Sequence, residues 1–413
     1  MKILQVSSSA GIGGAGIAAY RLHKGLRSLS VDSWMLVDAM TERAPFVIGP
    51  GTLFDKVMAR SVPILDRIPG KFLKPGMDRV SSSWMPNRLL SRVKSLAPDL
   101  INLHWVCDGF MRLETLPKLR TPIVWTMHDM WAFVGGEHYV GADERYKRGY
   151  TANNRPKVES GIDVNRWIWE RKSRSWRALD LDRFAIVTPS RWLADCVRDS
   201  KIFRNFRVEV LPNGIDEERF RPFSHDIVRE ILGLPFDKKL ILFGAVSASS
   251  DKRKGYHLLD HALKALEQQV DPEAYELIVF GALSGDNTSS IATRYLGNFH
   301  DEISMSLLYA AADVFLAPSL EDNLPNTVLE SLSCGTPVVA FDIGGMPDMI
   351  EHQKNGYLAR SFDIDDFVKG MRWVLDDVNW PDLARRARQT VLDKFTLTIA
   401  ASNYAELYKD LIA

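Results

Sequence analysis

The sequence offers little that could cross-link the chain or anchor it. Its three cysteines, Cys107, Cys196 and Cys334, stand far apart and form no CxxC pair. This leaves no basis for a disulfide framework or a cysteine-built zinc site and favours a reducing compartment. No apolar run approaches the roughly 18 residues of a membrane-spanning helix. The start, MKILQVSSSAGIGG, has too short an apolar run for a signal peptide and predicts a first strand. We expect a cytoplasmic protein that works in solution or peripherally at the inner membrane face.

An excess of charge of one sign is also missing. Lys and Arg number 52 and Asp and Glu number 52, so no nucleic-acid partner is indicated. With 46% hydrophobic and 25% charged residues, the composition is that of a globular protein. At 413 residues, two domains of about 200 residues each are expected.

Short apolar runs alternate with longer helical patterns, which is typical of a parallel α/β architecture. The turn signal in Leu211-Pro-Asn-Gly-Ile-Asp216 predicts domains at residues 1–210 and 211–395. We expect two Rossmann-like, doubly wound sheets facing a central cleft, with ligands at the carboxyl ends of the strands. The predicted strands are Lys2–Ser7, Val31–Val37, Asp99–Trp105, Pro122–His128, Phe184–Pro189, Arg207–Leu211, Leu240–Val246, Glu276–Phe280, Thr293–Phe299, Val314–Ala317, Pro337–Phe341 and Gly356–Ala359.

A glycine-rich loop, Gly11-Ile-Gly13-Gly14-Ala-Gly16, follows the first strand and opens a helix. Glycine lets backbone N–H groups approach a diphosphate, and a helix N-terminus favours its negative charge. The loop matches GxGxxG, and Asp38 stands where a ribose-binding acid would be, so a nicotinamide-linked oxidoreductase is one interpretation. Against it, Ser7–Ala10 separate the strand from the glycines.

A second motif runs from Ala317 to Gly345, APSLEDNLPNTVLESLSCGTPVVAFDIGG. It predicts a strand ending at Pro318, a polar turn, and a helix from Asn326 to Cys334. Asp322 in the turn and Glu330 on the helix can hydrogen-bond separate hydroxyl groups of one elongated ligand, with helix-start amides between them for phosphate. The alternative is a helix-capping Asp and a surface Glu.

The second motif resembles the donor-binding segment of retaining glycosyltransferases of family 4, P-S-x-x-E-G-F-G-x-x-x-x-E-A-x-x-x-G-x-P-V-x-x-x-x-x-G-G. The similarity extends over nearly the full length. Besides the first strand and its glycine loop, it rests on four segments in family order, Trp125-Thr-Met-His128-Asp, Thr188-Pro-Ser190, Asn213-Gly-Ile-Asp216 and Lys254-Gly255. It implies the GT-B fold and a final helix, residues 396–413, that returns to the N-terminal domain.

The resemblance also implies roles for single residues. Glu330 would bind the ribose hydroxyls, Asp322 the donor sugar, and Lys254 the diphosphate. His128 would lie beside the transferred sugar, so the implied catalytic residues are His128, Asp322 and Lys254. The implied donor-binding residues are Gly13, Gly14, Arg253, Lys254, Asn298, Phe299, Asp322, Asn323, Leu324, Asn326, Thr327 and Glu330.

Three positions depart from the family pattern. Asp322 stands where the family has a Glu, and the preceding residue, Glu321, could substitute for it. Pro325 replaces a glycine and removes an amide donor, which Asn326 or Thr327 could supply. Gly244-Ala245 lacks the usual Gly-Arg, and Arg253 is the candidate replacement for that arginine.

The family mechanism implies retention of anomeric configuration with no cofactor and no catalytic metal. Asp180-Leu-Asp182 and Asp363-Ile-Asp365 have the spelling of an Asp-x-Asp metal site, but helix capping explains both. A nucleotide-sugar epimerase and a nucleotide-sugar-binding protein without turnover are further interpretations. No complete acid–base pair for an epimerase is evident.

The preferred donor is UDP-glucose, with GDP-mannose as the alternative. The acceptor is expected to be a sugar, possibly lipid-linked, in exopolysaccharide or glycolipid assembly. His104-Trp105 and the segment Arg145–Arg177 are assigned to the acceptor side. That segment carries ten Lys or Arg against three acids, and also Trp167, Trp169 and Trp176. It predicts either a lid or membrane-surface patch, or a solvated helix with inward tryptophans.

Overall fold

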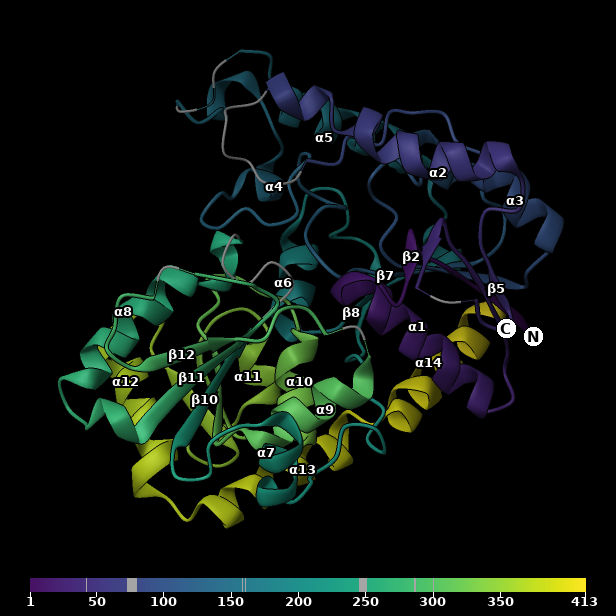
Figure 1. Cartoon of the computed structure of the whole chain (residues 1–413). Coiled ribbons are helices and arrows are strands. Elements are labelled where there is room, and N and C mark those ends of the chain that lie inside the picture. Colours follow the sequence, from purple (N-terminus) through teal and green to yellow (C-terminus); the bar gives the residue numbers. More distant parts are fainter. Residues whose placement is uncertain are drawn as a thin grey trace. The chain divides into compact units, whose positions relative to one another are not determined.

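The computed structural model describes residues 1–41, 43–72, 80–157, 159, 161–244, 251–285, 287–299 and 301–413. The chain divides into two compact units (Figure 1). Unit 1 comprises Met1–Pro212 with Ala400–Ala413, and unit 2 comprises Asn213–Ile399. These limits lie within a few residues of the boundaries predicted at 210/211 and 395/396.

Unit 1 is built on a parallel sheet of seven strands in the order β5-β3-β1-β6-β7-β8-β9. A separate parallel pair joins β2, which lies between β1 and the first helix in sequence, to β4, which follows β3. The strands are β1 Lys2–Val6, β2 Ser9–Ala10, β3 Asp32–Leu36, β4 Ala39–Met40, β5 Val47–Ile48, β6 Leu100–Leu103, β7 Ile123–Thr126, β8 Phe184–Thr188 and β9 Arg207–Val210. The helices are α1 Gly13–Ser28, α2 Leu53–Asp66, α3 Leu89–Leu96, α4 Arg145–Arg148, α5 Val164–Ser175, α6 Arg191–Asp199 and α14 Leu397–Ile412.

The strands of unit 1 are apolar on both sides because both faces of the sheet are covered. On β1, Ile3 belongs to one core cluster, whereas Leu4 and Val6 belong to another. The cluster around Ile3 is closed by α1 and by α14, which lie side by side (Figure 1). The last helix of the chain therefore completes the core of the N-terminal unit.

Unit 2 repeats the plan with a parallel sheet in the order β12-β11-β10-β13-β14-β15. Each face again has its own apolar cluster. The strands are β10 Lys239–Gly244, β11 Tyr275–Phe280, β12 Ala292–Tyr295, β13 Val314–Ala317, β14 Val338–Phe341 and β15 Gly356–Ala359. The helices are α7 His225–Leu232, α8 Tyr256–Glu267, α9 Glu302–Ala311, α10 Asn326–Ser333, α11 Met346–Met349, α12 Ile364–Arg372 and α13 Trp380–Lys394.

Each predicted strand overlaps an observed one, and two of the predictions need comment. The strand predicted at Thr293–Phe299 ends at Tyr295, because Gly297 adopts a φ of +70° that a strand cannot accommodate. The end of the strand predicted at Leu240–Val246 lies outside the described residues. The stretch Gly51–Pro86, with Pro63, Pro69, Pro75 and Pro86 among scattered apolar residues, predicts an insertion of short helices. In the structure α2 instead runs for 14 residues with Pro63 inside it.

Tyr408 on α14 provides a test of how far unit 1 depends on its last helix. The side chain is fully buried, and its hydroxyl accepts hydrogen bonds from Asn102 Nδ2 at 2.7 Å and Gln5 Nε2 at 3.3 Å. Tyr408→Ala should lower the free energy of unfolding by about 3–5 kcal/mol, because it leaves a cavity and unpaired amides.

Urea unfolding followed by tryptophan fluorescence would measure this, since only Trp373 and Trp380 lie in unit 2. The matched control is Glu406→Ala, at an exposed position on the same helix. Equal midpoints for the two variants would contradict the dependence of unit 1 on α14.

Candidate active site

A pocket in unit 2 opens where the strand order reverses. The chain proceeds from β10 to β11 and β12 on one side, then returns to place β13 on the other. Gly244 and Ala317, at the carboxyl ends of β10 and β13, line the pocket together with Lys254, Ser319 and Thr327. This switch point is the ligand-binding place of doubly wound sheets.

Asp322 is a buried carboxylate held by two cations. Lys254 Nζ donates to its Oδ2 at 2.7 Å, and Arg253 Nη1 lies 3.3 Å from the same oxygen. Burial alone would raise the pKa of Asp322, but Lys254, Arg253 and the N–H of Asn323 together lower it below its ordinary value. The carboxylate therefore stays ionised and fixes the Lys254 ammonium at the wall of the pocket.

Arg253 supports Asp322 and is not part of the pocket wall. Its guanidinium also donates to the Glu321 carbonyl at 2.9 Å and to Asp251 Oδ2 at 3.3 Å. We predicted that Arg253 replaces the family arginine that is missing after β10, and this stays a prediction. Ala245, which occupies the position of that arginine, lies outside the described residues.

Two glycines let the backbone close around Asp322. A Cβ on Gly344, whose φ is +52°, would lie 2.0 Å from the Asp322 carbonyl oxygen. A Cβ on Gly255, with a φ of +75°, would lie 1.9 Å from the Pro318 carbonyl oxygen. The close approach at Gly344 also permits a backbone hydrogen bond, in which Gly345 N donates to Asp322 O at 3.1 Å.

Glu330 lies on α10 behind an aromatic wall. It is 7% exposed, and its Oε2 accepts a hydrogen bond from Tyr309 Oη at 3.0 Å. The Tyr309 ring packs edge-on against Phe315, which lines the pocket, at a centroid distance of 5.6 Å. The interpretation of Glu330 as an ordinary surface residue is wrong, because the side chain is buried.

The helix start that carries Glu330 is close to expectation. α10 begins at Asn326, as predicted, with Pro325 as the residue before it and Thr327 in the pocket wall. Asn326 Oδ1 accepts a hydrogen bond from Asn213 Nδ2 at 3.4 Å. N–H groups at a helix start have no acceptor four residues earlier, which suits a helix start to an anion. In α10 the N–H of Val328 already donates to the Pro325 carbonyl at 3.1 Å.

Of the predicted donor-binding residues of unit 2, Lys254 and Thr327 line this pocket, whereas Asp322, Glu330 and the others are not in its lining. Leu324 belongs to the apolar core, Asn323 is buried, and Asn298 is exposed in the loop after β12. Phe299 packs against the core cluster of unit 2. None of these four side chains lines the pocket, so a contact with donor would have to use their backbone atoms or a different arrangement of the loop.

In unit 1, His128 belongs to a chain of largely buried hydrogen bonds. His104 Nδ1 lies 3.1 Å from His128 Nε2, and His104 Nε2 lies 2.8 Å from Gln5 Oε1. Gln5 continues the chain to Tyr408 on α14. Both histidines line a second pocket, at the carboxyl ends of β6 and β7.

Burial sets the charge of these histidines. It lowers the pKa of His128 to about 4 despite the neighbouring Asp129, and it lowers the pKa of His104 well below its ordinary value. His128 is therefore a neutral hydrogen-bonding group at neutral pH.

The sequence assigned His104 to the acceptor side but missed its link to Gln5 and Tyr408. Only the polar positions Gln5 and Asn102 within otherwise apolar strands could have signalled a buried network.

Asp129, next to His128, belongs to a second network that the sequence did not reveal. His138 Nδ1 lies 2.7 Å from Asp129 Oδ2, and His138 Nε2 lies 3.1 Å from Ser81 Oγ. This is the order of contacts in serine hydrolases, but Ser81 is fully buried. The contacts therefore hold the loop after β7 in place and offer no accessible nucleophile.

The glycine loop of unit 1 has the backbone expected of it. Gly11 and Gly13 adopt φ values of +73° and +68°, and α1 begins at Gly13, with Gly14 in its exposed first turn. β2 stands between β1 and these glycines. Asp38, the acid of the dinucleotide interpretation, is bound by Arg92 at 2.7 Å, so that interpretation loses support.

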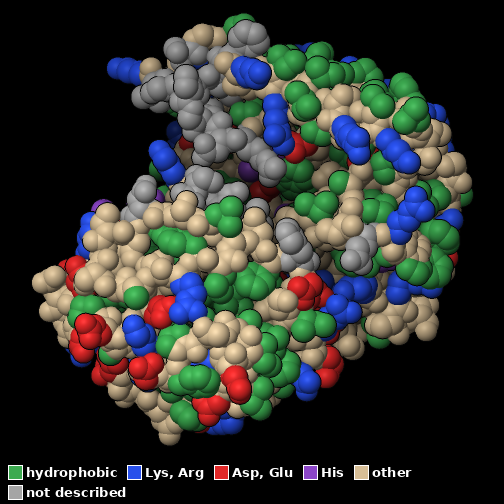
Figure 2. Space-filling view, viewed as in Figure 1, with side chains coloured by type: hydrophobic (Ala, Val, Ile, Leu, Met, Phe, Trp, Pro, Cys, Tyr) green, Lys and Arg blue, Asp and Glu red, His purple; other side chains and the backbone are tan. Residues whose placement is uncertain are grey.

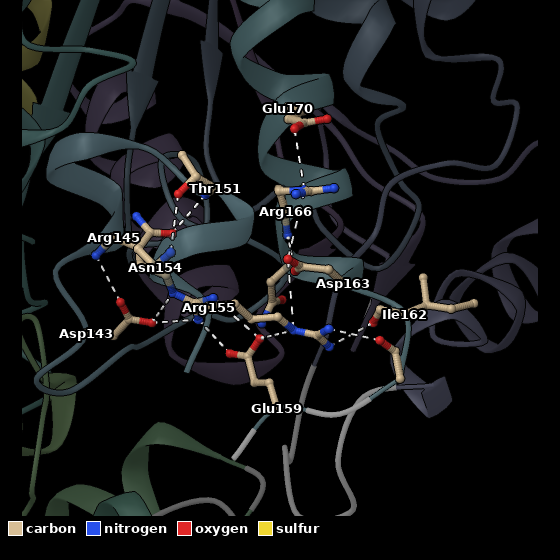
Figure 3. A network of polar contacts seen from close by, with 12 residues as sticks. Asp143, Arg145, Thr151, Asn154, Arg155, Glu159, Ile162, Asp163, Arg166 and Glu170 are labelled. Carbon is tan, nitrogen blue, oxygen red and sulfur yellow. Dashed lines mark hydrogen bonds and ion pairs between the residues drawn. The ribbon is translucent and has the colours of Figure 1, made fainter. Parts of the chain in front are cut away.

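The segment Arg145–Arg177 is largely folded into unit 1, and several of its cations pair with acids, some of them outside the segment (Figure 3). The Arg145 guanidinium lies 2.7 Å from Asp143 and 2.6 Å from Glu159. Lys172 is fully buried, donates to carbonyls of the loop after His128, including Gly135 at 2.6 Å, and has its pKa lowered to about 7 by burial.

The tryptophans of this segment mostly face inward. Trp169 and Trp176 are buried, whereas Trp167 is 39% exposed. The Trp176 ring packs against Trp125 at 5.4 Å. The alternative with inward tryptophans describes this segment better than a membrane-surface patch.

The two Asp-x-Asp sequences cap helical turns. Asp180 accepts a hydrogen bond from Asp182 N, and Asp363 accepts one from Asp366 N at the start of α12. Within the described part of the chain, no group of three or more His, Cys, Asp or Glu is arranged to hold a metal ion.

Comparison with known proteins decides the family. The model of Glycosyltransferase Family 4 matches residues 12–219, and that of Glycosyl transferases group 1 matches residues 237–377. The chain belongs to glycosyltransferase family 4. An Escherichia coli relative, UDP-Gal:alpha-D-GlcNAc-diphosphoundecaprenol alpha-1,3-galactosyltransferase, is 24% identical over 50% of this chain and 55% of its own. The chain spans about half the length of the first curated relatives it matches.

Solved structures confirm the fold of this family member. Sucrose-phosphate synthase from Thermosynechococcus elongatus superposes with a TM-score of 0.69 at 16% identity, over 100% of this chain and 99% of that one. Anabaena Alr3699/HepE in complex with UDP and glucose gives 0.61 at 17% identity, over 99% of both chains. The two doubly wound units are those of the GT-B fold. None of the described helices has both the length and the apolar character needed to cross a membrane.

The close approach at Gly344 predicts a specific weakness of unit 2. Gly344→Ala should lower the free energy of unfolding by more than about 1–3 kcal/mol, because a clash with backbone adds to the left-handed strain. The matched control is Gly233→Ala, which has the same strain at a φ of +61° but nothing within 4 Å of its Cβ. Scanning calorimetry of both variants would measure the difference, and equal losses would show that no close approach exists at Gly344.

The lowered pKa values of His104 and His128 predict a pH dependence of unit 1. An unfolded histidine takes up a proton near pH 6.5, whereas folded His128 does so only near pH 4. Stability should therefore fall as the pH drops from about 6.5 toward 4, by up to about 1.4 kcal/mol per pH unit for each such histidine. Urea unfolding at several pH values would show a shallower slope for His128→Gln, and an unchanged slope would contradict the assignment.

Proposed function

We propose that the protein is a retaining hexosyltransferase that uses a nucleotide diphosphate sugar, with UDP-glucose as the preferred donor. The observation that carries the proposal is the switch-point pocket of unit 2, where the Lys254 ammonium is fixed by Asp322 beside the start of α10. A compact cation and helix-start amides at one place suit a diphosphate.

The residues divide the donor among them in this proposal. Lys254 and the first-turn amides of α10 bind the diphosphate, Glu330 takes the ribose hydroxyls, and Asp322 takes hydroxyls of the sugar. Glu330 is already oriented by Tyr309, and Asp322 by Lys254 and Arg253. Carboxylates fixed in this way accept hydroxyl hydrogen bonds without losing side-chain freedom on binding. Gly13 and Gly14, at the start of α1, are proposed as further backbone donors for a diphosphate.

The transfer step needs charge stabilisation more than a protein base. The bond from the anomeric carbon to the phosphate oxygen breaks while a bond to the acceptor oxygen forms on the same face. The leaving phosphate accepts the proton of the acceptor hydroxyl. Lys254 and the helix amides stabilise the developing negative charge, so neither a cofactor nor a metal ion is required.

His128 is proposed to orient the transferred sugar. With a pKa of about 4 it is neutral at pH 7, so it hydrogen-bonds to a hydroxyl and carries no charge into the site. Its contact with His104 holds the ring in place.

The donor and acceptor rest on the names of the relatives. The Anabaena structure is described as a complex with UDP and glucose, and the Escherichia coli relative is named for UDP-Gal and a diphosphoundecaprenol-linked acceptor. We therefore place the reaction in polysaccharide or glycolipid synthesis, in the cytoplasm or at the inner membrane face. GDP-mannose is the alternative donor.

Calorimetric titration with UDP, GDP and NAD, each in the presence of EDTA, tests the proposal. UDP should bind, and Glu330→Ala should weaken that binding by about tenfold or more, because two hydrogen bonds to a charged group are lost. Glu351→Ala is the matched control, since Glu351 is an exposed acid of unit 2 paired only with Lys354 among the ion pairs of described residues.

The other outcomes separate the alternatives. Preference for GDP would change the donor and keep the mechanism, whereas binding of NAD alone would overturn the proposal. Once the donor is known, the anomeric configuration of the product, read by NMR, tests retention. Donor binding with neither transfer nor hydrolysis would favour a binding protein without turnover.

A further inference from the structure

Helix α2 exposes a row of large apolar side chains. Leu53, Val57 and Ile64 are 79%, 55% and 69% exposed, and their spacing places them on one side of the helix. Val62 and Asp66, on the opposite side, are the buried residues of α2. An ordinary surface helix buries its apolar stripe. The exposed stripe of α2 therefore indicates an interaction surface.

The apolar face continues beyond this row. Phe54 is 58% exposed and Leu65 is 37% exposed. Ile68 and Trp84 add exposed fractions of 37% and 38% beside the helix end, and Trp84 Nε1 donates to the Leu65 carbonyl at 3.3 Å. We call these seven residues, Leu53, Phe54, Val57, Ile64, Leu65, Ile68 and Trp84, the α2 face.

Positive charge borders the α2 face. Lys56 and Arg60, one turn apart on the flank of the helix, are exposed, and no described residue forms an ion pair with either. Arg88 and Arg67 stand nearby with half of their side chains exposed although they pair with Asp55 and Asp108. Figure 2 shows hydrophobic side chains and Lys or Arg side chains interspersed over α2, at the upper right of the view. Asp55 is only partly exposed and closes the capping box with Thr52.

We infer that the α2 face docks on an anionic lipid surface. Exposed aliphatic and aromatic side chains on one side of a helix, bordered by Lys and Arg and with a Trp at the edge, are the features of a helix that lies in a membrane interface. The cations select negatively charged headgroups. A protein partner or a second copy would bury the apolar side chains equally well but would not require the cationic border.

This inference moves the membrane contact away from the segment 145–177. There Arg145, Arg155 and Arg166 pair with acids (Figure 3). Two of the three tryptophans are buried. It does not depend on the proposed reaction, because lipid binding is measured without turnover.

Co-sedimentation with two kinds of vesicle tests the inference. The full-length chain should bind vesicles of equal parts phosphatidylcholine and phosphatidylglycerol at least about tenfold more tightly than pure phosphatidylcholine vesicles. The triple variant Leu53→Ser, Val57→Ser, Ile64→Ser should lose that binding by about tenfold or more. Circular dichroism should be unchanged, because the three side chains are exposed.

Matched controls come from elsewhere on the surface. Ile227→Ser, Ile231→Ser and Leu283→Ser together remove three apolar side chains of unit 2 that are 60%, 63% and 84% exposed, and should leave binding unchanged. Lys56→Glu with Arg60→Glu should abolish the preference for phosphatidylglycerol, whereas Lys118→Glu with Arg120→Glu, at exposed positions off the α2 face, should preserve it.

Three results would overturn the inference. They are absence of vesicle binding at low salt, equal loss of binding in the two serine triples, and a dimer in analytical ultracentrifugation that becomes a monomer in the α2 triple. The last result would assign the face to a second copy of the chain.

Discussion

The buried carboxylate of Asp322 constrains the architecture of unit 2 around its pocket. An isolated buried charge costs several kcal/mol, so it persists only where cations and N–H donors surround it. Lys254 and Arg253 provide the cations, from the loop after β10, whereas the carboxylate comes from the loop after β13. These two loops are thereby tied together, and Gly344 and Gly255 lack side chains where the backbone closes. The same interaction that stabilises the loops also leaves an ammonium at the pocket wall.

Unit 1 has both charged and neutral groups at its strand ends. Next to the Asp129 carboxylate, which is bound by His138, burial keeps His104 and His128 unprotonated and therefore neutral at pH 7. They are satisfied by one another, by Gln5 and, through it, by Tyr408. The neutral histidine pair and the charged Asp322 cluster have different dependences on pH, so these two sites should respond differently to acid.

The fold was largely predictable because each strand is a short apolar run between turn residues. β13 and β15 have the predicted limits, and α10 begins at the predicted residue. The placement of Asp322 in a turn and of Glu330 on the following helix was predictable because one continuous segment carries both, and their roles stay a prediction. The site was not predictable where partners are distant in sequence, as for Gln5 and Tyr408, or where a side chain such as Leu324 turns into the core. The long helix through Pro63 was missed because a proline inside a sequence usually indicates a helix end. In α2 the helix continues through Pro63 despite the lost hydrogen bond.

The return of α14 to unit 1 has a consequence for biosynthesis. The apolar sheet face around Ile3 and Val124 is covered in part by Ala401, Tyr404 and Tyr408, which the ribosome delivers only after all of unit 2. Unit 2 is continuous in the chain, so it can mature while the first unit is still waiting for its last helix. During that interval a newly made chain carries an uncovered hydrophobic sheet face. Such a surface promotes aggregation and is bound by chaperones. The order in which the two units are completed is thus the reverse of the order in which they begin.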